Sequence, residues 1–244
     1  MDCELSEAHR LIQQTARRVA REVVAPRAAE VDEQGVYPED YFQAFRAVGL
    51  LGTQIPEAQG GAGAGMLGLA LAIEEVAKYD CSAGLMLLLC ALPTQPVRLY
   101  GTAEQRAEIL GGGAAGRIRG CCALTEPDTG SDAAALRTTA VRAGDDWILN
   151  GEKVYISGAT VADYSIVWAN IEPGSGARGG RGFIVDTRSA GFSVPRTDRK
   201  MGVRGVPTGH LRLDNVRVPA ERLVGGAAAV DAAVGGGSAP RWRR

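Results

Sequence analysis

The chain has 244 residues, 45% of them hydrophobic and 23% charged, which is enough for one large or two ordinary domains with a buried core. Its 27 basic and 28 acidic residues leave a net charge of −1, so nothing electrostatic predicts nucleic acid or an anionic membrane as a partner. The acidic N-terminus lacks the basic and apolar regions of a secretory signal, and we expect no membrane span.

The cysteine pattern argues against a metal or disulfide framework. There are five cysteines, an odd number without C-x-x-C spacing, and only two histidines that could join them. We therefore expect reduced thiols in a cytoplasmic protein, and no metal site. The sequence also has no G-x-S-x-G motif, which gives nucleophilic catalysis by serine little support.

Up to about residue 115 the pattern is helical. Apolar residues at three- and four-residue steps predict an amphipathic helix over 5–23, and Pro38 starts a second helix that Gly49 ends. A third helix is expected over 66–79, and a buried fourth over 83–92 that breaks at the following prolines. A capping box, Thr-Ala-Glu-Gln, begins a short helix at 102 that three glycines at 111–113 should end.

After residue 118 the apolar period changes to two, which is typical of strands. The segments 147–149 and 152–156 predict a hairpin, because Asn150–Gly151 suits a type I′ turn. Further strands are expected over 164–171, 183–186 and 211–219. The glycine-rich run 173–180 lacks a following helix, so it predicts a loop and not a dinucleotide fingerprint.

These patterns predict an α+β protein in three parts. An all-helical domain over 1–117 precedes an antiparallel β-barrel-like domain over 118–225. The remaining residues, 226–244, are rich in alanine and glycine without a sustained period, and we expect a disordered tail.

Two segments of the second domain suggest a binding site. Residues 121–132 read CCALTEPDTGSD, a strand start followed by a Thr-Glu-Pro break and a Gly-Ser-Asp turn. Residues 150–158, NGEKVYISG, bring a second strand that ends in Tyr-Ile-Ser. Together they could cradle a flat cofactor that carries phosphate. Taken singly, each has a structural reading: a strand end, an ordinary turn, and an aromatic filling a sheet face.

The order of separated motifs resembles the acyl-CoA dehydrogenase family over about residues 5–225. The motifs are Ile55-Pro56-Glu57 with Gly60-Gly61, Gly101-Thr102-Ala103-Glu104-Gln105, Ala123 to Asp132, Leu149-Asn150-Gly151-Glu152-Lys153, Met201-Gly202-Val203-Arg204-Gly205 and Asn215-Val216-Arg217-Val218-Pro219. The resemblance implies bound FAD, oxidation of the α,β bond of an acyl-CoA thioester, and electron transfer to an electron-transferring flavoprotein.

The resemblance also implies particular binding residues. Tyr155 takes the position of the aromatic on the flavin face, Ser157 that of the donor to the reactive nitrogen, and Ser131 also touches acyl-CoA. Glu126 shapes the loop, since the family's catalytic base comes from elsewhere. The implied cofactor-binding residues are Cys122, Leu124, Thr125, Gly130, Ser131, Tyr155, Ile156 and Ser157.

The family continues past its β domain into a C-terminal helical bundle, which supplies the carboxylate base and builds the homo-oligomer. Here the family pattern ends near Gly225. We therefore expect a truncated dehydrogenase without a catalytic base of its own, weakly active or inactive alone. Two alternatives remain open: a non-catalytic fragment that binds flavin or acyl-CoA, and a flavin monooxygenase or nitroalkane-oxidase-like enzyme on the same scaffold.

Overall fold

The computed structural model describes residues 4–172, 174–175, 179–226 and 229–230. These residues form two compact units, and each unit is assembled from three separate segments of the chain. The helical unit combines 1–94, 107–119 and 199–207, and the sheet unit combines 95–106, 120–198 and 208–244. The predicted domain boundary after residue 117 stays a prediction. Most of the predicted tail, 226–244, lies outside the described residues.

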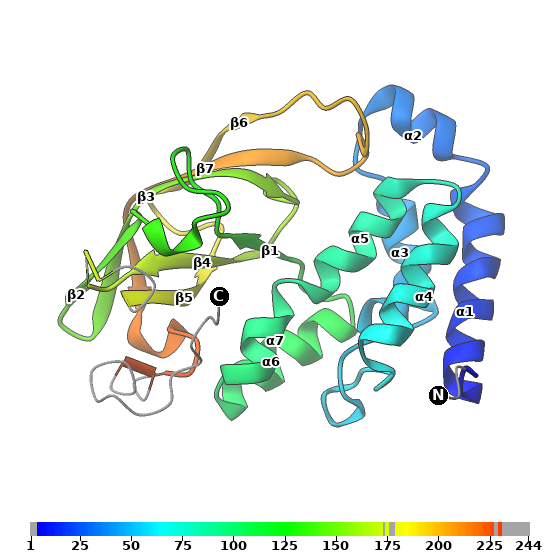
Figure 1. Cartoon of the computed structure of the whole chain (residues 1–244), viewed down its shortest axis with the longest axis horizontal. Coiled ribbons are helices and arrows are strands. Elements are labelled where there is room, and N and C mark those ends of the chain that lie inside the picture. Colours follow the sequence, from blue (N-terminus) through cyan, green and yellow to red (C-terminus); the bar gives the residue numbers. More distant parts are fainter. Residues whose placement is uncertain (1–3, 173, 176–178, 227–228, 231–244) are drawn as a thin grey trace. The chain divides into compact units, whose positions relative to one another are not determined.

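The first half of the chain is helical, as its apolar period predicts (Figure 1). The helices are α1 Glu7–Val19, α2 Ala28–Gln34, α3 Glu39–Ala47, α4 Gly65–Ala77, α5 Cys81–Ala91, α6 Thr94–Tyr100 and α7 Ala103–Ala114. A π turn, Ala20–Val24, follows α1 directly. Pro38 precedes α3, which confirms the predicted start of that helix.

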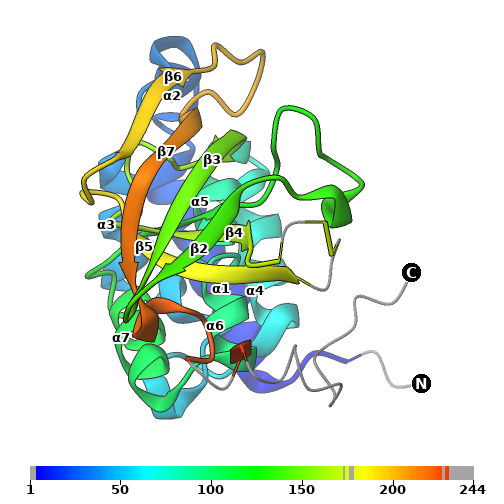
Figure 2. The ribbon, with the colours of Figure 1, turned by 90° about the vertical axis from the view of Figure 1, so that its left-hand side faces the viewer.

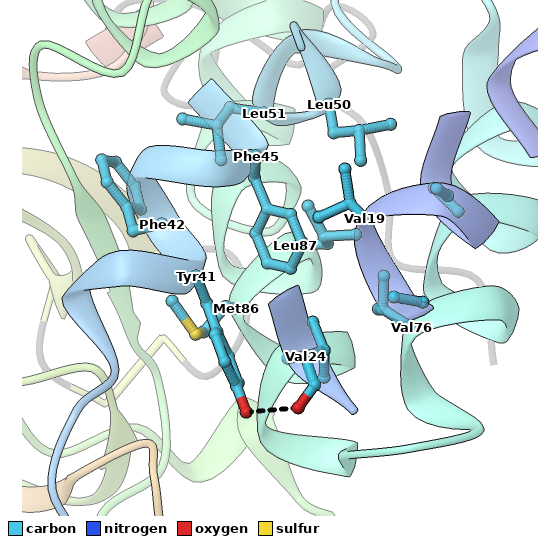
Figure 3. Close-up of a cluster of buried hydrophobic side chains, with 14 of the residues drawn as sticks. Val19, Val24, Tyr41, Phe42, Phe45, Leu50, Leu51, Val76, Met86 and Leu87 are labelled. Carbon is cyan, nitrogen blue, oxygen red and sulfur yellow. Dashed lines mark hydrogen bonds between the residues drawn. The ribbon is translucent and has the colours of Figure 1, made fainter. Parts of the chain in front are cut away.

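The core of the helical unit is built from the apolar faces of α1, α3, α4 and α5 (Figure 3). Tyr41 is fully buried in it, and its hydroxyl donates a hydrogen bond of 3.0 Å to the carbonyl of Val24. That carbonyl belongs to the π turn at the end of α1, where backbone acceptors need partners. The tyrosine therefore fills the core and satisfies a helix end with one side chain.

Helix α5 ends at Ala91 and α6 begins at Thr94, so the predicted break occurs at Pro93, whereas Pro96 lies inside α6. The run Cys81–Tyr100 is nevertheless long and apolar enough to cross a membrane by length and composition, which corrects the expectation that no stretch approaches a span. Half of that window is buried inside the structure, and a core helix of a soluble protein passes the same test. The finding is weak evidence for a membrane.

The beginning of α7 confirms its predicted cap, but its predicted end is wrong. The Gln105 amide donates to the Thr102 hydroxyl at 3.3 Å, and the Gln105 side chain accepts from the Thr102 amide at 3.1 Å. The helix then runs through the three glycines to Ala114. A Cβ at Gly112 would lie 2.8 Å from the Ile118 side chain, which would have to shift to admit it. The left-handed residue after the helix is Gly116.

The sheet unit holds a curled seven-stranded sheet. Its strands are β1 Gly120–Ala123, β2 Thr139–Ala143, β3 Asp146–Ser157, β4 Tyr164–Asn170, β5 Gly180–Asp186, β6 Phe192–Thr197 and β7 Thr208–Pro219. The order is β1-β4-β2-β3-β7-β6, with β5 also on β4, and β2, β3, β7 and β6 lie side by side in Figure 2. The predicted antiparallel pairing is only partly right, because β1 and β2 both pair with β4 in parallel.

The inner face of this sheet carries the second core. Trp147 of β3 packs edge-to-face on Phe183 of β5, with ring centroids 5.6 Å apart. Around this pair lie buried aliphatic residues from six strands, β1 to β5 and β7, and from the chain after β7. The alternation of β7, in which Leu211, Leu213 and Val216 are buried, places it in this core as the sequence predicts.

The predicted hairpin at Asn150–Gly151 is wrong, because both residues lie inside β3. The hairpin turn is instead Gly144–Asp145, between β2 and β3, with Gly144 at φ 66°. The pairing of β3 with β7 shifts register between Leu149 and Gly151. A Cβ at Gly151 would lie 2.5 Å from the Thr138 hydroxyl, so this glycine serves a close approach and not a turn.

Candidate functional site

The Thr-Glu-Pro segment turns sharply after β1. Glu126 and Thr129 exchange two backbone hydrogen bonds, of 2.9 and 3.2 Å, around Pro127 and Asp128. The Glu126 side chain is 5% exposed and accepts from the backbone amides of Arg137 at 2.7 Å and Thr138 at 2.9 Å. Glu126 thus ties the turn to the residues that lead into β2, which agrees with a loop-shaping role.

Lys153 of β3 completes the attachment of this segment. Its side chain is fully buried, and Nζ donates to a Glu126 carboxylate oxygen at 2.8 Å and to the Leu124 carbonyl at 3.1 Å. Next to it the Val154 amide donates to the Thr125 carbonyl at 2.9 Å. Residues 124–126 are therefore fixed along the second half of β3.

The charges of this buried pair depend on each other. Burial alone would raise the pKa of Glu126, but the hydrogen bonds from Lys153 and Thr138 outweigh it and lower that pKa to about 2. Burial lowers the pKa of Lys153, and the Glu126 carboxylate opposes this shift. A low carboxyl pKa makes Glu126 a poor proton acceptor at neutral pH, which agrees with its assignment as a structural residue.

Tyr155 has an unusual conformation. Leu211 pairs with Lys153 and Gly209 with Ile156, so Val154 and Tyr155 together face the single residue His210. This is a β-bulge, and Tyr155 lies in the left-handed region at φ 60° with 66% of its surface exposed. A strained non-glycine residue that displays an aromatic ring to solvent is typical of a binding surface.

The other two predicted residues of this strand differ in their exposure. Ile156 is 3% exposed and packs in the sheet-unit core, so its side chain is not open to a ligand. Ser157 is half-buried and pairs with Thr208. Among the described residues no side-chain hydrogen bond engages the hydroxyls of Ser157, Thr125 or Ser131, and such hydroxyls can donate to a bound molecule.

Gly130 and Ser131 lie beyond the Glu126–Thr129 turn and are both exposed. A Cβ at Gly130 would meet nothing within 4 Å, so packing within the protein does not require glycine at this position. The space leaves room for a phosphate to approach the backbone. The structure brings Leu124 and Thr125 against β3 next to Tyr155, while Gly130 and Ser131 lie in the loop beyond the Glu126–Thr129 turn.

The cysteines of β1 are thiols at neutral pH. Burial raises the pKa of Cys121 to about 12 and also raises that of the half-buried Cys122. Both are free, as are Cys81 and Cys90. Cys122 can therefore line a site by its shape, but it is no thiolate nucleophile.

A small hollow opens on the loop side of this junction, with a volume of about 170 Å³. The residues around it include Glu126, Arg137, Thr138 and Glu152. Ligand pockets for molecules of cofactor size start at roughly 300 Å³, so this hollow is too small to hold a flavin. Within the described part of the chain, no group of three or more histidine, cysteine, aspartate or glutamate side chains could hold a metal ion.

Sequence reasoning missed Lys153 as the partner that fixes the segment. Strand alternation places it on the inward face with Trp147 and Leu149, and an inward lysine needs a buried counter-ion. It also missed His210, which faces the bulge. No local signal marks His210, because a bulge depends on the pairing of two strands.

Two protein-family models match this chain. The model described as acyl-CoA dehydrogenase, N-terminal domain, matches residues 6–117, and the model described as acyl-CoA dehydrogenase, middle domain, matches 121–216. A curated relative, the "Probable acyl-CoA dehydrogenase" of Mycobacterium leprae, is 38% identical over 222 residues. That alignment covers 91% of this chain and 57% of the relative, so the chain spans little more than half the length of this relative.

Two solved structures are similar. Butyryl-CoA dehydrogenase from Megasphaera elsdenii aligns at a TM-score of 0.88 and 31% identity, over 92% of this chain and 60% of that one. Glutaryl-CoA dehydrogenase from Mycobacterium smegmatis, solved in complex with FADH2, aligns at 0.82 and 35% identity, over 90% and 55%. With two family models matching most of its length, this chain belongs to the acyl-CoA dehydrogenase family.

Proposed function

We propose that this chain binds FAD on the outer end of β3 and forms the flavin and acyl-CoA shelf of a dehydrogenase that oxidises the α,β bond of acyl-CoA thioesters. The observation that carries the proposal is Tyr155, an exposed aromatic in a left-handed bulge, adjoining the anchored segment 124–126. Support for the cofactor also comes from the glutaryl-CoA dehydrogenase relative in complex with FADH2.

The residues present fit such a group. The Tyr155 ring offers a flat apolar surface, and the hydroxyls of Thr125 and Ser157 have capacity to donate to a polar ring edge. The open backbone around Gly130 and the hydroxyl of Ser131 suit a pyrophosphate, and Ser131 is also the proposed acyl-CoA contact. Bound FAD would supply the two-electron acceptor for the reaction.

Within this chain we assign binding and positioning roles only. Glu126 is committed to Lys153 and two backbone amides, so it does not serve as the α-proton base. We propose that the base, the assembly into a homo-oligomer and the docking of an electron-transferring flavoprotein involve parts of the family fold that this chain does not span. A cytoplasmic location is supported by the free thiols Cys121 and Cys122.

The test is a titration of the full chain with FAD, in which the quenching of flavin fluorescence measures binding. Wild type should bind, and Tyr155→Leu should bind more weakly, because the flat surface is lost. The matched control is Tyr79→Leu. Tyr79 is another exposed tyrosine, at 43% exposure, and lies in the helical unit in the turn that follows α4. Binding that both substitutions weaken equally, or that neither changes, would count against the site.

A second step adds acyl-CoAs of several chain lengths to the FAD-loaded chain, once without oxygen and once in air. Bleaching of the flavin without oxygen would show that the chain is an active dehydrogenase, and bound flavin that never bleaches would indicate a binding fragment. Product that forms only in air would indicate an oxidase or monooxygenase instead.

A further inference from the structure

The exposed ring of Tyr155 has a specific neighbour behind it. The centroid of the His210 imidazole lies 5.7 Å from that of the phenol ring, and the two planes meet at 67°. Such an edge-to-face arrangement is a favourable geometry for two aromatic rings. His210 is also the single residue of β7 opposite the bulge, so the backbone pairing and the ring contact select the same partner.

The His210 imidazole is also held in place by a carboxylate at its Nε2 atom. Its Nε2 lies 3.1 and 3.2 Å from the two carboxylate oxygens of Asp198, and Arg196 pairs with the same carboxylate at 3.3 Å. The side chains of Asp198 and His210 are 16% and 23% exposed. Asp198, which follows β6, and His210 are both mostly buried, and together they form a polar contact that reaches the exposed ring of Tyr155.

We infer that His210, fixed by Asp198, is a positioning residue that holds the Tyr155 ring outward as a preformed wall for a flat ligand. The bulge sets the direction in which the Tyr155 side chain leaves the backbone, and the ring contact restricts its rotation. A surface fixed before binding loses less conformational entropy when the ligand arrives. That the ligand is FAD rests on the proposed function above.

The ring geometry can be measured without any ligand. The chain contains six tyrosines and is labelled throughout with 3-fluorotyrosine; the fluorine NMR signal lost in Tyr155→Phe identifies Tyr155. His210→Ala and Asp198→Ala should each shift or broaden this signal and leave the signals of the other tyrosines in place. The matched control is His9→Ala, which replaces the other histidine, in the helical unit.

His210→Gln serves as a second variant that keeps a polar partner for Asp198 if the alanine variant does not fold. It removes the ring, so it should move the Tyr155 signal as well. A Tyr155 signal that is the same in wild type and in folded His210 variants would overturn the inference.

The FAD titration separates this inference from the proposed function. His210→Ala should weaken FAD binding about two- to tenfold, the range that an aromatic contact provides. If wild type binds FAD and His210→Ala binds it equally well, the positioning role is refuted while the site stands. If wild type binds no FAD but His210→Ala still moves the Tyr155 signal alone, the positioning role stands and the proposed cofactor fails.

Discussion

The buried pair of Glu126 and Lys153 gives the sharpest test of how the site is built. In Lys153→Met the apolar stem is kept and the ammonium is lost, so the Glu126 carboxylate, 5% exposed, remains without its counter-ion. Removing one partner of a buried ion pair typically costs about 3–5 kcal/mol. Two backbone amides still donate to Glu126, and we therefore expect a loss of about 3 kcal/mol in the free energy of unfolding.

The loss in the free energy of unfolding should be measured by urea denaturation, with tryptophan fluorescence as the signal. Two of the three tryptophans, Trp147 and Trp168, lie on β3 and β4, so their signal reports on the sheet unit that contains the pair. The matched control is Arg188→Met, which breaks an ion pair of similar length, 2.9 Å, whose side chains are 80% and 50% exposed. That exposed pair should contribute no more than about 1 kcal/mol.

A double variant then isolates the pair itself. In Lys153→Met combined with Glu126→Gln the orphaned charge is gone, so the combined loss should be smaller than the sum of the two single losses. The reasoning is refuted if Lys153→Met costs no more than Arg188→Met, or if the two single losses add up. Either result would mean that the ion pair does not hold residues 124–126 on β3.

The pKa of Glu126 is lowered to about 2 in the folded chain, against roughly 4.3 for a glutamate in the unfolded chain. The ionised Glu126 therefore stabilises the fold fully above roughly pH 4.3, and this stabilisation is lost as the pH falls toward 2. Glu126→Gln should reduce this loss at acid pH, measured as urea midpoints over a series of pH values. Gly151→Ala should cost about 1–3 kcal/mol through overlap with the neighbouring threonine, whereas Gly130→Ala, in open space, should leave the urea midpoint unchanged and weaken only FAD binding. Tyr155→Gly should keep the stability or raise it by up to about 1 kcal/mol while FAD binding is lost, and a clear destabilisation would contradict the assigned backbone strain.

The sequence predicts those elements whose signals are local. The capping box at Thr102 and Gln105 works within four residues, and Pro38 starts α3 through its own fixed backbone angle. The apolar periods likewise separate a helical half from a strand half, because each period follows from the geometry of one element. The family resemblance then extends the fold prediction beyond what these periods carry, and the family models confirm it.

The errors occur where a distant segment decides the structure. Asn150–Gly151 has the chemistry of a turn, yet β7 pairs with it and Thr138 packs on Gly151, so the chain continues straight. The strand β6 was not predicted because it is short and contains Pro195, but it lies at the end of the sheet order, where proline is tolerated. The parallel partners of β4 are equally invisible in local sequence.

The same distinction applies to the candidate site. Its exposed residues carry a motif that the resemblance can transfer, whereas the contacts that hold them in place, Lys153 with Glu126 and His210 with Tyr155, depend on strand pairing. The roles of the transferred residues in cofactor binding stay predictions. The supporting contacts are findings of the structure.

The bulge in β3 connects these two sets of contacts. In an unbroken strand, residues two apart lie on one face, so Tyr155 would point inward beside Lys153 and compete with the ion pair for space. The extra residue in the bulge leaves Lys153 and Ile156 buried and turns Tyr155 out to 66% exposure. The left-handed backbone conformation at position 155 is less stable for tyrosine than for glycine, so backbone stability does not favour a tyrosine there. The reason must lie in what the ring contacts, and the contact described above, His210, lies behind the ring and leaves most of it exposed.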